Sequence, residues 1–247
     1  MRALAHEAKF VDLPLPDARI VAYVRRNAAA SVGPVTIYIE SDGAPWRLPD
    51  EPPADPTPLK PLVMRMAIAD ASAASAYVSR PCQYLSDKDR LNCDPRLWMQ
   101  ARFSSEAVSA TNNAIDAIKS STGAAVVNLV GYSGGGAMAA LVASRRKDVG
   151  CLVTVAAPLD TSAWTDALRV SRLDLSLNPA DAAGELRSVR QTHFRGLRDK
   201  LVPPSTVERF VERAKPGAAV IDEPGFDHQC CWSDAWRELS RSSCLAD

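Results

Sequence analysis

A serine flanked by glycines is the clearest chemical signal in this sequence. The pentapeptide is Gly131-Tyr132-Ser133-Gly134-Gly135. It follows an apolar run, residues 125–130, that is typical of a buried strand, and it opens a helical pattern. A G-x-S-x-G turn in this context is a nucleophile elbow, which lifts the hydroxyl above the sheet edge, beside a helix N-terminus that favours negative charge. A phosphate-binding turn would need a Lys-Ser/Thr pair that is missing here. We therefore interpret Ser133 as a nucleophile.

A serine nucleophile needs a base, and the sequence offers three histidines. His228 lies in a predicted turn, residues 224–228, between the last predicted strand and the last predicted helix. His193 lies inside a strand pattern, which favours a structural role, and His6 precedes the predicted sheet. We therefore predict that His228 is the base, with His193 as the alternative.

A carboxylate must orient that base. Asp199 follows the predicted strand at residues 192–196, and it completes the chain order Ser, Asp, His that accompanies this kind of elbow. The alternative for Asp199 is a turn former before a proline pair, and Asp160 is then the reserve acid. Asp227 is adjacent to His228 in sequence and would point away from its ring. We predict Asp199.

Acyl chemistry also needs donors for a developing oxyanion. The backbone N–H of Gly134, directly after the nucleophile, is the first expected donor. The second is expected from residues 41–46, after the third predicted strand. Gly43 allows close backbone approach there, and Ala44 has an N–H whereas Pro45 has none, so we favour Ala44.

Strand and helix patterns alternate along the chain and predict an α/β fold. The candidate strands are Ile20–Val24, Val35–Glu40, Ala76–Ser79, Ala125–Val130, Leu152–Ala156, Thr192–Gly196 and Ala218–Asp222, and the clearest helices are Glu106–Lys119, Gly134–Arg146, Thr206–Ala214 and Trp232–Arg241. Alternation of this kind predicts a mostly parallel sheet of about seven to eight strands with helices on both faces. The first strands are expected to be antiparallel.

Length and composition bound the organisation and the partners. The chain has 247 residues, 29 basic and 29 acidic side chains and 47% hydrophobic residues, which suits one globular domain over residues 1–247. The charge balance argues against nucleic acid as a partner. The uncharged stretch between Lys119 and Arg145 contains the glycine-rich turn and is interpreted as strand, turn and helix, so no transmembrane segment is expected.

Two segments are expected to border a substrate pocket. Residues 44–61 form a proline-rich loop, and residues 158–190 form a small helical excursion. Trp46, Trp98 and Trp164 are candidates for lining an acyl site, the alternative being ordinary packing. The oligomeric state is left open.

The six cysteines suggest one disulfide and no metal site. Cys82 and Cys93 bracket a polar loop and are the best candidate pair, although Cys230 is an alternative partner for either. Cys151 begins a buried strand and is expected to be a packed thiol. No metal-binding spacing is present, and no cofactor is expected. A disulfide favours an extracytoplasmic location, periplasmic or secreted, over the cytoplasm, and no apolar signal-peptide core opens this chain.

These motifs together resemble the α/β-hydrolase fold serine hydrolases. The resemblance runs roughly from Val35 to Trp232, and the segment Ile37–Gly43 is similar to a Tyr-Ile-Glu-Gly-Asp-Gly strand of small bacterial hydrolases, with Ser41 in place of the first glycine. Asp42-Gly43 stands where many members have His-Gly. The resemblance implies a Ser133-His228-Asp199 triad and acyl transfer to water.

The resemblance leaves the substrate open, because this fold serves many reactions. A carboxylic ester hydrolase acting on a small-molecule acyl substrate is the leading hypothesis. A thioesterase or acyltransferase is the second, and it would be supported by a basic patch for coenzyme A phosphates, for which Arg80, Arg90 and Arg96 are the candidates. A catalytically silent binding protein is the third hypothesis, and the complete triad argues against it.

Overall fold

One mixed sheet forms the centre of the molecule. The computed structural model describes residues 1–26, 33–43 and 53–246. In these residues an eight-stranded sheet has the order β1-β2-β4-β3-β5-β6-β7-β8. The strands are β1 (Val11–Leu13), β2 (Ala22–Arg26), β3 (Val35–Ile39), β4 (Ala74–Val78), β5 (Val127–Tyr132), β6 (Val149–Val155), β7 (Arg190–Gly196) and β8 (Ala218–Glu223). Strands β3 to β8 are parallel, so the predicted mostly parallel sheet is confirmed.

The antiparallel prediction holds only at one end of the sheet. Strand β1 pairs with β2, and β2 with β4, in antiparallel register, but β3 runs parallel to both β4 and β5. Strand β2 therefore runs opposite to β3, as expected of the first strands, but β4 lies between them; β3 and β4 are parallel because helix α2 (Leu62–Ala69) connects them. A crossover through a helix returns the chain in the same direction, whereas a tight turn reverses it. The short edge strand β1 was not predicted.

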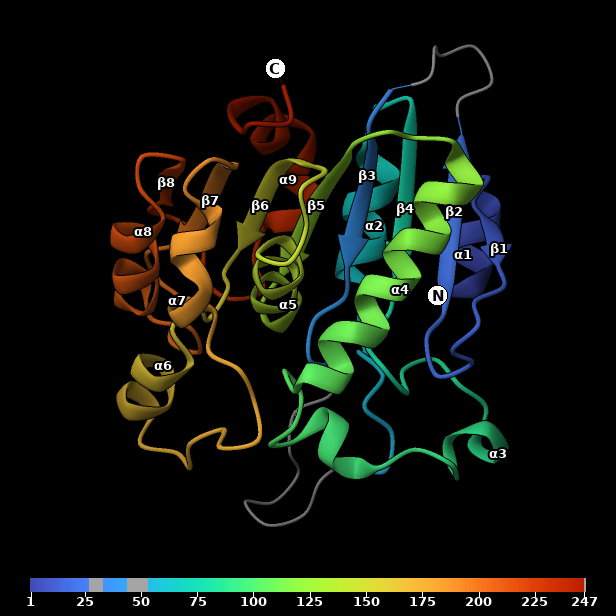
Figure 1. The fold of residues 1–247 in the computed structure, drawn as a ribbon, viewed down its shortest axis with the longest axis horizontal. Helices are drawn as coiled ribbons and strands as arrows, with labels where there is room; N and C mark the ends of the chain where they lie inside the picture. The colour runs from blue at the N-terminus through green and yellow to red at the C-terminus, as the bar shows by residue number, and fades with distance from the viewer. Residues whose placement is uncertain (27–32, 44–52, 247) are drawn as a thin grey trace.

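Helices cover both faces of this sheet, as predicted (Figure 1). The remaining helices are α1 (Arg2–Glu7), α3 (Asp87–Arg90), α4 (Ser105–Thr122), α5 (Gly134–Ala143), α6 (Thr161–Leu168), α7 (Pro179–Ala182), α8 (Glu208–Ala214) and α9 (Trp232–Leu239). Helices α4, α5 and α8 contribute to one buried cluster, and α1, α2 and α9 contribute to a second on the opposite face. In the described residues no helix is long and apolar enough to span a membrane.

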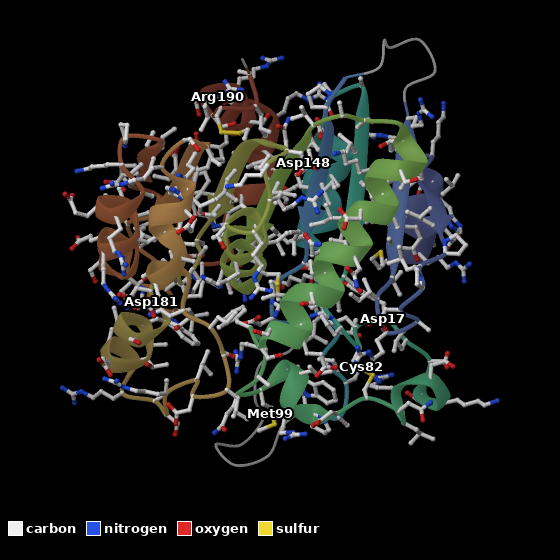
Figure 2. All side chains as sticks on the ribbon, in the orientation of Figure 1. Asp17, Cys82, Met99, Asp148, Asp181 and Arg190 are labelled. Carbon is white, nitrogen blue, oxygen red and sulfur yellow. A yellow bond between two sulfur atoms is a disulfide. The ribbon has the colours of Figure 1, made fainter. Side chains whose placement is uncertain are left out.

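The carboxyl edge of the sheet is the lower edge in Figure 1, where the arrow of β3 points. In Figure 2, Cys82 and Asp181 lie toward this edge, whereas Asp148 and Arg190 lie toward the opposite one. The excursion at residues 158–190 begins at the carboxyl edge, where α6 lies, and returns past α7 to Arg190 at the opposite edge, where β7 begins. Of the proline-rich loop, residues 44–52 lie outside the described residues.

The cysteines form three disulfides, whereas the sequence suggested one. The disulfides are Cys82–Cys93, Cys151–Cys244 and Cys230–Cys231. The prediction of a packed thiol at Cys151 was wrong, because the C-terminal segment returns to the sheet. There the backbone N–H of Cys244 donates to the Thr192 hydroxyl of β7 at 3.1 Å. The first pair joins the end of β4 to the segment before α4 at the carboxyl edge.

Candidate active site

The sharp turn between β5 and α5 presents Ser133. This serine has φ 53° and ψ −127°, a left-handed value that is unusual outside glycine, and it directly precedes α5. A Cβ placed on Gly131 would lie 2.2 Å from the Gly135 carbonyl oxygen, and one on Gly135 would lie 2.2 Å from the Ile39 carbonyl oxygen. Both positions therefore require glycine. The turn passes so close to its neighbours that the hydroxyl is held at the sheet edge.

His228 lies between the serine and an aspartate. Its Nε2 is 3.0 Å from the Ser133 Oγ, and its Nδ1 is 2.8 Å from the Asp199 Oδ2. Asp199 is itself fixed, because its Oδ1 accepts the backbone N–H groups of Leu201 and Val202, each at 2.8 Å. The Asp199 side chain is 1% exposed and that of His228 is 15% exposed. The structure thus brings together the three side chains that the sequence singled out.

A tyrosine of the nucleophile elbow holds the loop that carries His228. The Tyr132 hydroxyl donates to the His228 carbonyl oxygen at 2.5 Å. The Asp227 Oδ1 accepts the N–H groups of Gln229 and Cys230, and these bonds lower the pKa of that carboxyl. Sequence reasoning identified Tyr132 only as an elbow residue. No local signal pointed to the hydroxyl bond, because its partner lies in a distant loop.

The alternative residues have other partners. Asp160 caps α6 by accepting the N–H groups of Ser162 and Ala163, and its second oxygen accepts a bond from Arg209 at 3.2 Å. His193 is fully buried in β7 and contacts the Thr154 hydroxyl at 2.8 Å, and burial lowers its pKa to about 3. His6 contacts Asp12 at 2.7 Å. None of these contacts involves Ser133 or His228.

The expected oxyanion region is only partly described. Ala44 and Trp46 lie outside the described residues, whereas Gly43 has φ 91°, and a Cβ there would lie 1.7 Å from the Pro56 carbonyl oxygen. The Asp42 carboxylate overlies Gly134, and sequence reasoning gave Asp42 no role beyond its place in the motif. The three consecutive glycines that follow Ser133 were the available signal of close approach at this position.

The two described tryptophans differ in position. Trp98 is 8% exposed, belongs to the core and donates to the Pro53 carbonyl oxygen at 3.0 Å. Trp164 of α6 is partly exposed and donates to the Leu201 carbonyl oxygen at 2.7 Å, next to the loop of Asp199. Of these two, Trp164 is the one that contacts the loop carrying Asp199.

Solved structures share this fold at low sequence identity. Est1E from Butyrivibrio proteoclasticus matches with a TM-score of 0.64 and 11% identity over 96% of this chain and 99% of that chain. A putative dienelactone hydrolase from Klebsiella pneumoniae matches with a TM-score of 0.66 and 15% identity, over 96% of this chain and 98% of that chain. A puromycin hydrolase matches with a TM-score of 0.64 and 17% identity over 92% of this chain. This match spans only 37% of that longer chain. These likenesses and the strand order define an α/β-hydrolase fold.

Comparison with models of protein families identifies the family to which the chain belongs. The family described as serine hydrolase (FSH1) matches residues 62–229, more than half of the chain, and the protein belongs to that family. The matched span includes Ser133, Asp199 and His228, and it leaves out β3 and the residues directly after it. A comparison with curated protein sequences found no match.

Proposed function

We propose that this serine hydrolase cleaves carboxylic esters of small or medium acyl groups through an acyl-enzyme on Ser133. The observation that carries the proposal is the chain of contacts from the Ser133 Oγ through His228 to Asp199, at 3.0 and 2.8 Å. Both distances are within the range of proton transfer through hydrogen bonds. A serine so connected is a nucleophile rather than a solvated turn residue.

The proposed reaction has two halves. His228 Nε2 takes the hydroxyl proton while the Ser133 Oγ attacks the acyl carbon, and the imidazolium then gives that proton to the departing alcohol. In the second half the same nitrogen takes a proton from water while the water oxygen attacks the acyl carbon, and it then gives that proton to the Ser133 Oγ as the acid leaves. Asp199 holds the ring tautomer and stabilises the imidazolium. The N–H of Gly134 and an N–H from the segment after β3 receive the oxyanion.

The thioester alternative has less support. Arg80, Arg90 and Arg96, the candidates for a phosphate patch, each pair with a carboxylate. Their partners are Asp42 for Arg80, Asp55 and Asp87 for Arg90, and Asp94 for Arg96. A guanidinium already neutralised by a carboxylate attracts phosphate weakly. We therefore favour an oxygen ester over a coenzyme A thioester.

We also propose that residues 1–247 act as one domain whose segments 44–61 and 158–190 border the pocket. Trp164, partly exposed beside the loop of Asp199, is the described side chain that supports this role for the second segment. A large aromatic surface there suits an apolar acyl or alcohol group.

Covalent labelling with a fluorophosphonate tests the function. The intact protein is expected to gain one adduct, located on Ser133 by mass spectrometry, and Ser133→Ala is expected to gain none. Ser120→Ala, at an exposed serine near the C-terminal end of α4, is the matched control and should label as the wild type does. An unlabelled wild type would support a silent hydrolase fold. A panel of p-nitrophenyl esters of graded chain length, with one thioester, then ranks the substrates.

A further inference from the structure

The Asp42 carboxylate occupies the place where residue 134 would carry a side chain. A Cβ built on Gly134 would lie 2.0 Å from the Asp42 Oδ1 and 2.4 Å from its Oδ2. Residues 40–43, which we call the β3 loop, therefore lie against the first residue after the nucleophile. An isolated carboxylate here would repel an oxyanion bound by the Gly134 N–H.

Two buried arginines hold both oxygens of that carboxylate. Arg80 Nη1 donates to the Asp42 Oδ1 at 2.8 Å, and Arg102 Nη1 donates to the Oδ2 at 3.1 Å. Their side chains are 4% and 11% exposed. Although burial raises the pKa of Asp42, the charges of Arg102 and Arg80 outweigh it and hold that pKa below its usual value. The two guanidiniums therefore neutralise the Asp42 carboxylate, and the buried Glu40 carboxylate also acts on Arg80.

The arginines are themselves anchored to two separate segments. Arg80 follows β4, and its second nitrogen donates to the Arg102 carbonyl oxygen. Arg102 Nε donates to the Met99 carbonyl oxygen at 2.6 Å. The Cys82–Cys93 disulfide joins the same two stretches of chain. Arg80 and Arg102 therefore hold Asp42 between two segments that are themselves linked to each other.

A second contact set holds the rest of the β3 loop. The Ser41 N–H donates to the Glu40 carboxylate at 2.8 Å, and the Ser41 carbonyl accepts a bond from Gln83 at 2.9 Å. In the part of the chain that the structure describes, the N–H groups of Asp42 and Gly43 donate to no acceptor.

From this geometry we infer that Arg80 and Arg102 are positioning residues of the oxyanion hole. By binding Asp42 they fix the β3 loop against Gly134, and they neutralise its carboxylate so that an oxyanion does not form beside an unpaired negative charge. The inference rests on the proposed ester hydrolysis, and it goes beyond it because the family match does not reach the β3 loop. Both arginines are inferred to act through Asp42 rather than on the substrate itself.

The test compares three variants of the full chain. Arg102→Gln removes the ion pair with Asp42 and one positive charge, and Arg102→Lys retains the charge. Arg96→Gln is the matched control, because Arg96 is 70% exposed and its one ion pair among the described residues is with Asp94. Arg102 is chosen over the more buried Arg80, whose loss is more damaging to folding. Thermal melting identifies the temperature at which all variants are folded.

Removal of an oxyanion donor costs about 10²- to 10³-fold in kcat, so displacement of the loop should cost about 10- to 100-fold. We expect Arg102→Gln to show this loss in kcat for a p-nitrophenyl ester with KM within about threefold of wild type. Arg102→Lys should recover part of the rate, and amide hydrogen exchange in residues 41–43 should be faster in Arg102→Gln.

A kcat for Arg102→Gln equal to that of Arg96→Gln would overturn the inference, as would a Lys variant no better than the Gln variant. If wild type neither hydrolyses esters nor reacts with the fluorophosphonate, the proposed function fails separately. The exchange measurement then decides the positioning claim, and unchanged exchange of residues 41–43 overturns it.

Discussion

His193 lies within strand β7 and is completely buried, whereas His228 lies on the loop between β8 and α9 and is partly exposed. Both rings have a hydroxyl neighbour, Thr154 for His193 and Ser133 for His228. The difference is at the second nitrogen. His228 Nδ1 contacts the Asp199 carboxylate, while the His193 Nε2 has no partner among the described residues.

This comparison shows that a hydroxyl contact alone does not make a base. Burial without a carboxylate lowers the pKa of His193 to about 3, because the charged ring is deprived of water. A ring that stays neutral at ordinary pH can hold a strand in place but cannot accept a proton readily. A carboxylate behind the ring supports the imidazolium that acyl transfer requires.

The largest expected effect separates the two histidines directly. His228→Gln should lower kcat/KM for esters by about 10⁵-fold or more, because the serine loses its base. His193→Asn should stay within about threefold of wild type when assayed near pH 7.5 at a temperature where it is folded. Steady-state kinetics on both variants provide the measurement. Comparable losses in the two variants would contradict the assignment of His228.

The next effect compares two aspartates. Asp199→Asn should lower kcat by about 10⁴-fold, since an amide supports the wrong tautomer of His228. Asp160→Asn should change the rate little, because asparagine also caps a helix and the lost partner, Arg209, is 48% exposed. A larger rate loss at 160 than at 199 would overturn the choice of acid.

A smaller effect is expected at Tyr132. Tyr132→Phe removes the hydroxyl bond to the His228 carbonyl oxygen and should lower kcat about 5- to 10-fold, the scale of one hydrogen bond. KM should change little. Tyr23→Phe is the control, because the Tyr23 hydroxyl makes no hydrogen bond in the described residues. Equal kcat values for the two variants would show that the bond does not position His228.

The last prediction concerns stability rather than rate. The His193 pKa of about 3 in the folded protein is below the unfolded value of about 6.5, so the unfolded chain binds more protons between these pH values. The free energy of unfolding should therefore fall as pH decreases through this window. From pH 6.5 to 4.5 His193 should contribute a loss of about 2 to 3 kcal/mol.

Urea unfolding at pH 7 and pH 4.5 measures this loss. His193→Asn should lose less stability than wild type on acidification, since it has no ring to protonate on unfolding. His6→Gln, a change at an exposed histidine, should retain the wild-type difference. Equal acid sensitivity in His193→Asn and wild type would contradict the assigned surroundings of His193.

The elbow and the fold class were predictable because their causes are local. Gly131 and Gly135 avoid contacts within the turn and with β3, and a strand followed by a helix is visible in the residue pattern. The Cys151–Cys244 disulfide was not predictable in this way. A buried thiol and one half of a long-range cystine have the same local sequence, and only the return of the C-terminal segment distinguishes them.

For a related reason, the sequence did not reveal the roles of Arg80, Arg102 and Asp42. From the sequence, Arg80 was a candidate for a phosphate patch. The sequence around a loop arginine does not show whether its side chain is buried. The structure places it 4% exposed against Asp42. The partner of a buried charge depends on which loops meet at the sheet edge, and strand order decides that.

By itself the sequence determined the strained serine turn, the alternation of strands and helices, and the short set of residues able to complete a hydrolytic site. These properties arise from backbone sterics and periodic burial over a few residues. Only the tertiary structure decided which histidine lies between a serine and a carboxylate, which loop overlies Gly134 and which cysteines join. Contacts between distant residues exist only once the sheet has ordered its strands and brought their ends together.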